Sequence, residues 1–202
     1  MIDTLYIEQA IATHPRVRKI GSRFPNANQV MCERYGAVFN RKSQNFRLQK
    51  KNPSLILAHK FDNHVLTTPE GYGIGGRNNY YFSHMLNCIY DCRYCFLQGM
   101  YRSAHYVLFV NYDDFFSAMD AKLVAHDGED VWFFSGYDCD SLALDPLTGF
   151  AEHLLSYLET RPHAMVELRT KSTQIRALLG QAPLSNVIVA FSLTPEPAAV
   201  AL

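Results

Sequence analysis

Three cysteines, Cys88, Cys92 and Cys95, are the side chains of this 202-residue chain with the clearest potential for chemistry. They are separated by three and then two residues, which is too tight for one face of a helix and predicts a loop folded around a single object. A [4Fe–4S] cube normally takes one thiolate per iron. Three thiolates would therefore leave one iron free to bind something other than protein.

A zinc site is the main alternative use of these thiols. Zinc sites usually pair C-x2-C with a second Cys/His pair well separated in sequence, and the nearest candidates for a fourth ligand are His84, His105 and Cys139. Disulfides fit less well, because five cysteines is an odd number and no feature marks the chain as secreted. A [4Fe–4S] cluster with one iron not bound by protein is the preferred interpretation, and a zinc site remains an alternative.

The net charge of zero hides an uneven distribution of charge along the chain. Residues 1–60 carry eleven Lys/Arg and three Asp/Glu, a balance of +8, whereas residues 61–202 carry eight and sixteen, a balance of −8. A basic segment can face a polyanion such as nucleic acid, and the segment 16–51 is the candidate for such a contact. It can equally pack on the acidic part of its own chain.

Composition places the chain among ordinary globular proteins, with 48% hydrophobic and 19% charged residues. No apolar run approaches the ~20 residues that a membrane-spanning helix needs, and residues 1–5 do not begin a secretory signal. Reduced thiols and an oxygen-sensitive cluster would both suit the cytoplasm, which is the predicted location.

Strand-like and helix-like segments alternate along the chain, which predicts a parallel α/β arrangement. The glycine-rich stretch 67–76 is expected to form a flexible turn, because its glycine spacing is not the dinucleotide-binding pattern. Strands are expected at 5–8, 54–58, 79–85, 106–110, 131–134, 164–169 and 186–193, and helices at 113–124, 146–158 and 173–179.

The C-x3-C-x2-C spacing resembles that of the radical S-adenosylmethionine (SAM) superfamily, in which the open iron binds SAM and SAM is cleaved to a 5′-deoxyadenosyl radical. Further segments are similar to the spore photoproduct lyase family of radical SAM DNA-repair enzymes. Those segments are 5–8, the continuation of the cysteine loop at 96–98, and the stretches 140–148, 170–171 and 191–193.

The resemblance implies roles for individual residues. Cys88, Cys92 and Cys95 would hold the [4Fe–4S] cluster, and Lys171, Ser192 and Asp140 would help to hold SAM. The implied reaction is that of a carbon–carbon lyase: the adenosyl radical abstracts hydrogen from a thymine dimer in DNA and two thymines are restored without light. Damaged DNA and an external electron donor are the implied partners.

Two departures from the family put the lyase reaction in question. Tyr137 stands at the position of the family's hydrogen-donating cysteine, and Cys139 follows two residues later. The family's pair of tyrosines around the third cluster cysteine is represented by Tyr94 and Phe96. The candidates for handling a radical are therefore Tyr94, Tyr137 and Cys139. A radical SAM enzyme with another substrate, and a zinc-stabilised nucleic-acid-binding module without catalysis, remain alternatives.

The resemblance also predicts the architecture. We expect a basic N-terminal extension over residues 1–76, packed on the core, and an incomplete (β/α) radical SAM barrel over residues 77–202 with its cluster loop at 88–95. About four barrel strands are expected, with the strand at 106–110 lying outside the barrel. Family members continue well past residue 202, so the barrel is expected to be truncated at its C-terminal end.

Overall fold

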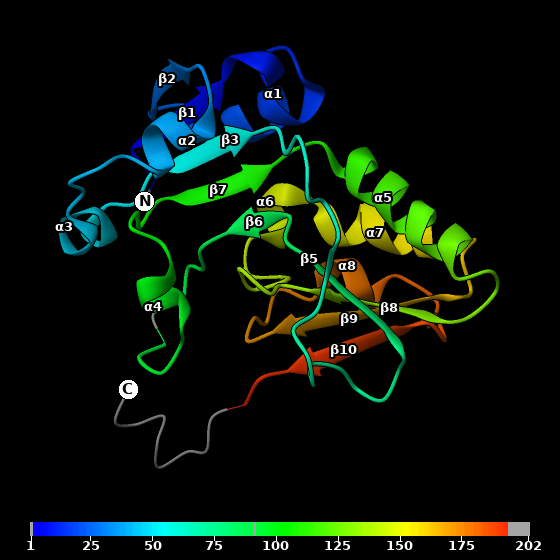
Figure 1. Ribbon diagram of the computed structural model, residues 1–202. Helices are drawn as coiled ribbons and strands as arrows, with labels where there is room; N and C mark the ends of the chain where they lie inside the picture. The colour runs from blue at the N-terminus through cyan, green and yellow to red at the C-terminus, as the bar shows by residue number, and fades with distance from the viewer. Residues whose placement is uncertain (1, 91, 194–202) are drawn as a thin grey trace. The chain divides into compact units, whose positions relative to one another are not determined.

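The computed structural model describes residues 2–90 and 92–193, and it divides the chain into two compact units. The first unit combines residues 1–60 with 84–110, and the second combines 61–83 with 111–202. Each unit contains one five-stranded sheet (Figure 1). The predicted boundary between residues 76 and 77 stays a prediction, and the predicted truncation falls on residues outside the described part of the chain.

The first unit is built on a sheet with the strand order β2-β1-β3-β7-β6. The first four of these strands are parallel and β6 pairs antiparallel with β7. β3 occupies the centre because all four of its residues are apolar and buried, as expected for a strand covered on both faces. The strands are β1 Thr4–Glu8, β2 Asn28–Cys32, β3 Leu55–Ala58, β6 Met85–Leu86 and β7 Tyr106–Phe109.

The second unit is built on an open sheet with the strand order β10-β9-β8-β5-β4. β5, β8, β9 and β10 are parallel, and β4 pairs antiparallel with β5 at one edge. The predicted α/β class, with about four parallel barrel strands and the strand near 106 outside them, is confirmed. The strands are β4 Leu66–Thr67, β5 Asn78–Phe82, β8 Val131–Ser135, β9 Ala164–Thr170 and β10 Val187–Phe191.

Two helices, α5 Tyr112–Ala125 and α7 Phe150–Leu158, pack together against the second sheet (Figure 1). The ring of Phe82 in β5 contacts Phe115 of α5 and Phe150 of α7, with centroid separations of 6.4 and 5.9 Å. Phe116 stacks on Tyr157 at 4.6 Å, which joins the two helices directly. The core of this unit is therefore aromatic. Its other helices are α6 Asp145–Thr148 and α8 Arg176–Leu179.

Three predicted elements differ in the structure. The strand expected at 79–85 is divided at Ser83, so that β5 belongs to the second unit and β6 to the first. The helix expected at 146–158 is broken at Gly149, whose φ of +61° ends α6 before α7 begins. The helix expected at 173–179 is limited to α8.

Several short elements of the first unit were not predicted. They lie between residues 15 and 52, where basic and polar residues give little hydrophobic periodicity. They are α1 Pro15–Gly21, α2 Tyr35–Phe39 and α3 Phe46–Lys51, together with β2, and a 3-10 turn η1 Gln9–Ile11 precedes them. A later short helix, α4 Leu97–Met100, follows the cysteine loop.

Across the described residues, no helix combines the length and the apolar character that crossing a membrane would require.

Candidate functional site

The three-cysteine loop lies in the first unit between β6 and α4. All three cysteines are half-buried. The backbone N–H of Tyr90 lies 3.4 Å from Cys88 Sγ and donates to it, and the N–H of Cys95 donates to the carbonyl of Cys92 at 3.0 Å, closing a turn. Within residues 2–90 and 92–193, no three His, Cys, Asp or Glu side chains are gathered tightly enough to hold a metal ion. The fit to an iron–sulfur cluster therefore rests on the donor set, three accessible thiols in one short loop.

Asn87 closes this loop at its base. Its side-chain amide donates to the backbone carbonyls of Ser103 and His105, both at 2.7 Å, and the residue is buried with a φ of +66°. Asparagine tolerates this left-handed conformation better than most residues. The entry and exit of the cysteine loop are thus tied together. Sequence reasoning missed Asn87, although an asparagine just before a thiol motif is a typical loop-forming residue.

The three residues considered as a fourth zinc ligand lie in different surroundings. Burial lowers the pKa of His84 to about 3, so that its ring is neutral. Burial also lowers the pKa of His105, whose Nδ1 accepts a hydrogen bond from the backbone N–H of Ser54 at 3.0 Å. Cys139 is buried and belongs to the second unit. The hydrogen bond from Ser54 gives His105 a structural role, and His84 is buried in the first unit.

In the second unit, a tight turn after β8 begins at Gly136. Its φ is +80°, and a Cβ placed there would lie 2.5 Å from Ser141 Oγ. Only glycine fits both the conformation and the space. The backbone N–H of Ser141 donates to the carbonyl of Arg169 at 3.1 Å, which holds the returning chain against β9. This turn carries Tyr137, Cys139 and Asp140.

Asp140 connects the turn after β8 to the end of β9. Its Oδ1 accepts from the backbone N–H groups of Leu142 and Ala143, at 3.0 and 2.9 Å, and from the hydroxyl of Thr170 at 2.6 Å. Its Oδ2 accepts from the backbone N–H of Lys171 at 2.6 Å. The carboxylate is buried and occupied by four hydrogen bonds within the protein.

Lys171 and Ser192 lie beside each other at the next two strand ends. Lys171 Nζ donates to the carbonyl of Ser192 at 3.4 Å, and the N–H of Ser192 donates to the carbonyl of Thr170 at 2.8 Å. The three residues predicted to hold SAM are therefore brought together where β8, β9 and β10 end. The carboxyl ends of parallel strands are the usual position of a site in such folds.

Two buried hydroxyl groups at this end of the sheet suit a polar ligand. Among the described residues, the Oγ atoms of Ser135 and Ser141 are buried without a hydrogen-bond partner. Unsatisfied buried polar atoms are uncommon in native proteins and often mark a missing ligand or water. The strand ends therefore fit a group with hydrogen-bonding capacity, such as the amino-acid portion of SAM.

Tyr137 is part of a cluster of three tyrosines in the second unit. Its ring lies 4.3 Å from that of Tyr81 and 5.8 Å from that of Tyr72, measured between centroids. Burial raises the pKa of both Tyr72 and Tyr81, so both phenols keep their protons at neutral pH. The sequence did not identify Tyr72 and Tyr81 as part of this cluster, because strand pairing and a long turn bring them to Tyr137.

The two aromatic residues around the third cluster cysteine, Tyr94 and Phe96, lie in the first unit with most of their surface exposed, at 61% and 59%. The thiol loop with Tyr94 and the strand-end residues with Tyr137 and Cys139 thus form two groups, one in each unit.

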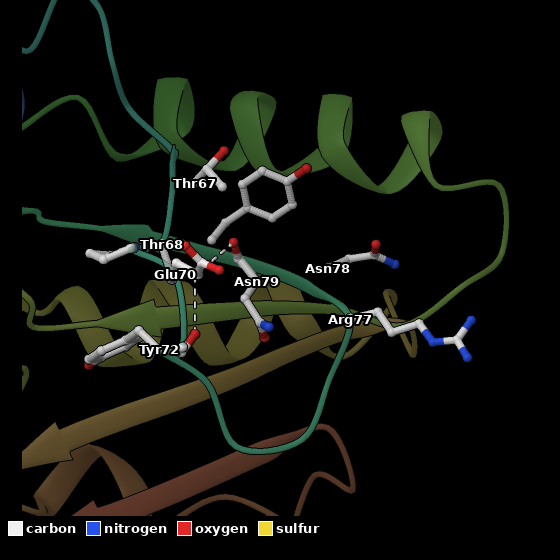
Figure 2. A pocket seen from close by; sticks show the side chains of 10 residues that line it. Thr67, Thr68, Glu70, Tyr72, Arg77, Asn78 and Asn79 are labelled. Atoms are coloured by element: carbon white, nitrogen blue, oxygen red, sulfur yellow. Dashed lines mark hydrogen bonds between the residues drawn. The ribbon is translucent and has the colours of Figure 1, made fainter.

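The glycine-rich stretch forms the connection between β4 and β5, as predicted. The hydroxyl of Thr68 lies within hydrogen-bond distance of the carbonyls of Tyr72, at 3.2 Å, and Asn79, at 3.3 Å. A shallow pocket of about 280 Å³ lies against this turn, and Arg77 is the one basic residue among those that line it (Figure 2). The pocket has no cluster of cations, so it offers little to a phosphate group.

A parallel strand set with polar residues at its carboxyl ends, combined with a C-x3-C-x2-C loop, defines the class of radical SAM partial barrels. The comparison with protein families is consistent with that class. The family model described as "Spore photoproduct lyase" matches residues 77–197. This match covers more than half of the chain, and the chain therefore belongs to the spore photoproduct lyase family of the radical SAM superfamily.

Solved structures of spore photoproduct lyase share the fold. A variant with bound AdoMet and dinucleoside spore photoproduct superimposes with a TM-score of 0.82 at 16% identity, and a complex with dinucleoside spore photoproduct does so with a TM-score of 0.80 at 16% identity. A tyrosine-to-phenylalanine variant gives 0.81 at 17% identity. Each match covers 96% of this chain and 56% of the other, so the chain spans little more than half the length of these structures. A search of curated proteins found no match.

Proposed function

We propose that this chain takes part in radical SAM repair of a thymine dimer in DNA, without light. The family match over residues 77–197 carries the proposal, because it includes both the thiol loop and the strand ends with Asp140, Lys171 and Ser192. Bound to Cys88, Cys92 and Cys95, a [4Fe–4S] cluster would supply the reductive cleavage of SAM to a 5′-deoxyadenosyl radical. The dinucleoside spore photoproduct in related structures supports a DNA lesion as the substrate.

Lys171 and Ser192 are the residues proposed to bind the amino-acid portion of SAM. The lysine ammonium is a compact point charge suited to a carboxylate. Ser192 offers a hydroxyl beside it. Asp140, predicted from the sequence as a third SAM residue, already accepts four hydrogen bonds within the protein. We therefore assign it a positioning role, acting through the backbone of Lys171.

Tyr137 is the proposed hydrogen-atom donor on the substrate side, with Cys139 and Tyr94 as the other candidates. Its phenol stands at the position of the family's donor cysteine and is in ring contact with Tyr81. Cys139 is buried, at 7% exposure, which limits its access to a substrate. The replacement of a cysteine by a tyrosine also favours a second candidate function, radical SAM chemistry on a different substrate.

An external electron donor and a cytoplasmic location complete the proposal. Reductive cleavage of SAM needs an electron that this chain does not supply. The odd number of cysteines, five, suits a protein kept in a reducing compartment better than one held together by disulfides.

Anaerobic reconstitution tests the proposal. With iron, sulfide, SAM and dithionite, we expect a brown protein absorbing near ~400 nm that produces 5′-deoxyadenosine. Replacing Cys88, Cys92 or Cys95 by alanine should abolish both signals, and Cys32→Ala is the matched control because Cys32 is also half-buried and lies outside the loop. A colourless protein that holds one zinc ion would overturn the proposal. Incubation with dinucleoside spore photoproduct then separates the lyase reaction from chemistry on another substrate.

A further inference from the structure

A second polar pocket lies in the first unit and includes His105 but none of the three cysteines of the loop. Its volume is about 340 Å³, and it is formed by the chain before and within α3, by β1 and by the residue preceding β7. Six of its lining residues bear on its chemistry. They are Tyr6, Arg41, Lys42, Gln44, Gln49 and His105.

Two glutamines hold the wall of this pocket in place. The Gln44 amide donates to the carbonyls of Phe39, at 2.8 Å, and Arg41, at 2.9 Å, which closes the loop that carries the cations. The Gln49 amide donates to Gln44 Oε1 at 2.6 Å, and Gln49 Oε1 accepts from the backbone N–H of Ala104 at 3.0 Å. The loop is thus connected to α3 and to the segment before β7.

The charge of the pocket is positive and uncompensated. Arg41 and Lys42 are exposed, and in the part of the chain described here neither forms an ion pair with a carboxylate. No lining residue is acidic. The two carboxylates closest in sequence to Tyr6 have other partners: Asp3 accepts a hydrogen bond from Asn52, and the buried Glu8 lies 3.2 Å from Arg34. The pocket therefore suits an anion.

Two rings add a surface for a planar group. Tyr6 and His105 lie 6.3 Å apart with an interplanar angle of 43°. Because His105 Nδ1 accepts from the backbone N–H of Ser54, the neutral ring carries its hydrogen on Nε2 and can donate to a ligand. Cations beside aromatic rings are the usual means of binding single-stranded nucleic acid, where rings stack on bases and cations contact phosphates.

We propose that this pocket binds one nucleotide of a nucleic-acid strand, with its phosphate on Arg41 and Lys42 and its base against Tyr6 and His105. The inference extends the proposed function, on which it rests for the identity of the polymer as DNA. It gives the first unit a role in holding the strand. A polymer is favoured over a free nucleotide because residues 1–60 carry a balance of +8, which offers phosphate contacts beyond a single site.

Fluorescence anisotropy with a labelled, undamaged single-stranded oligodeoxynucleotide tests the proposal on the full chain. We expect the double variant Arg41→Ala/Lys42→Ala to weaken binding at least about tenfold in ~0.1 M salt. Its plot of log K against log salt concentration should become shallower by about 1.4, at roughly 0.7 for each lost phosphate contact. Tyr6→Leu should weaken binding about fivefold or more through lost stacking.

Arg77→Ala/Arg176→Ala is the matched control. It removes the same charge from exposed positions of the second unit, outside the basic segment 16–51, and should change affinity less than about threefold. Equal losses in the two double variants, or no loss in the pocket variant, would overturn the proposal. Thymidine 5′-monophosphate should compete with the oligonucleotide better than inorganic phosphate, and equal competition would refute the base contact.

Failure of this inference can be distinguished from failure of the proposed function. The pocket variants should keep the ~400 nm absorption and the production of 5′-deoxyadenosine, because neither depends on an undamaged strand. Conversely, a protein that binds the oligonucleotide through this pocket but never produces 5′-deoxyadenosine would refute the radical SAM activity alone.

Discussion

The backbone N–H of Lys171 donates to Asp140 Oδ2 at 2.6 Å, so the residue proposed to bind SAM is held by a carboxylate from the neighbouring strand end. The same carboxylate holds Leu142, Ala143 and Thr170. One side chain thus fixes the position of the lysine backbone while leaving its ammonium group to reach toward β10.

Asp140→Ala should lower the free energy of unfolding by about 2–4 kcal/mol, because buried donors lose their acceptor. Asp140→Asn should cost less stability, since its carbonyl oxygen can keep the contacts of Oδ1, but its NH2 group would face the N–H of Lys171. We expect this variant to weaken SAM binding about tenfold. Urea unfolding and calorimetric titration with SAM on the reconstituted protein measure the two effects.

Lys171→Ala provides the comparison for Asp140→Asn, and Lys122→Ala in α5 is a control for the loss of a lysine from the same unit. The cluster absorption should survive in all three variants. If Lys171→Ala weakens SAM binding and Asp140→Asn does not, the positioning role of Asp140 is wrong.

Gly136→Ala should destabilise the protein more than Gly149→Ala. Both glycines have positive φ values, +80° and +61°, which cost an L residue about 1–2 kcal/mol. A Cβ at Gly136 would also lie 2.5 Å from Ser141 Oγ, whereas one at Gly149 meets nothing within 4 Å. We therefore expect a loss of about 3 kcal/mol or more for the first and about 1 kcal/mol for the second. Equal losses in chemical denaturation would show that the turn after β8 can widen.

His84 should make the protein sensitive to acid. Its folded-state pKa of about 3 lies below the ordinary value of 6.5, so the unfolded chain takes up a proton first as the pH falls. The contribution of neutral His84 to the free energy of unfolding is fully present above about pH 6.5. It is lost as the pH falls from about 6.5 to 3, at roughly 1.4 kcal/mol per pH unit. The free energy of unfolding should therefore fall less from pH 7 to pH 5 in His84→Leu than in the natural protein, by about 2 kcal/mol. The same pH dependence in both proteins would contradict a neutral buried His84.

Tyr137→Phe should abolish the return of hydrogen to the product radical, because it removes the phenol O–H and keeps the ring contact with Tyr81. Tyr137→Cys restores a thiol at the family's donor position and should support repair of spore photoproduct. Product analysis by mass spectrometry, with Cys139→Ala in parallel, identifies the donor. An unchanged product distribution in Tyr137→Phe together with a changed one in Cys139→Ala would transfer the role to Cys139.

The parallel strands and the thiol loop could be predicted because their signals are local. The run at 131–134 is apolar and aromatic, and it forms the buried β8. The spacing of Cys88, Cys92 and Cys95 restricts the chain to a loop whatever surrounds it. Lys171 and Ser192 were predicted from resemblance, and the structure brings them within hydrogen-bond distance.

Other features could not be predicted because they depend on contacts between distant residues. The role of Asn87 is recognised only from its hydrogen bonds to Ser103 and His105. The role of Tyr81 is recognised only from its ring contact with Tyr137. The pocket beside Arg41 is formed in part by α3, a six-residue helix with no buried residue. This helix could not be predicted because its sequence has little hydrophobic periodicity. Short polar elements are held by tertiary contacts more than by their own propensity.

The chain passes from one unit to the other after residues 60, 83 and 110, so each unit is formed by separate stretches of the chain. Cleavage at any one of these junctions divides the stretches that complete a sheet: severing the chain after residue 83, for example, takes β7 away from β3. A protease that nicks the protein there should consequently leave fragments that remain associated until denaturant is added. Neither half expressed by itself should recover a cooperative unfolding transition, whereas the two halves produced together should.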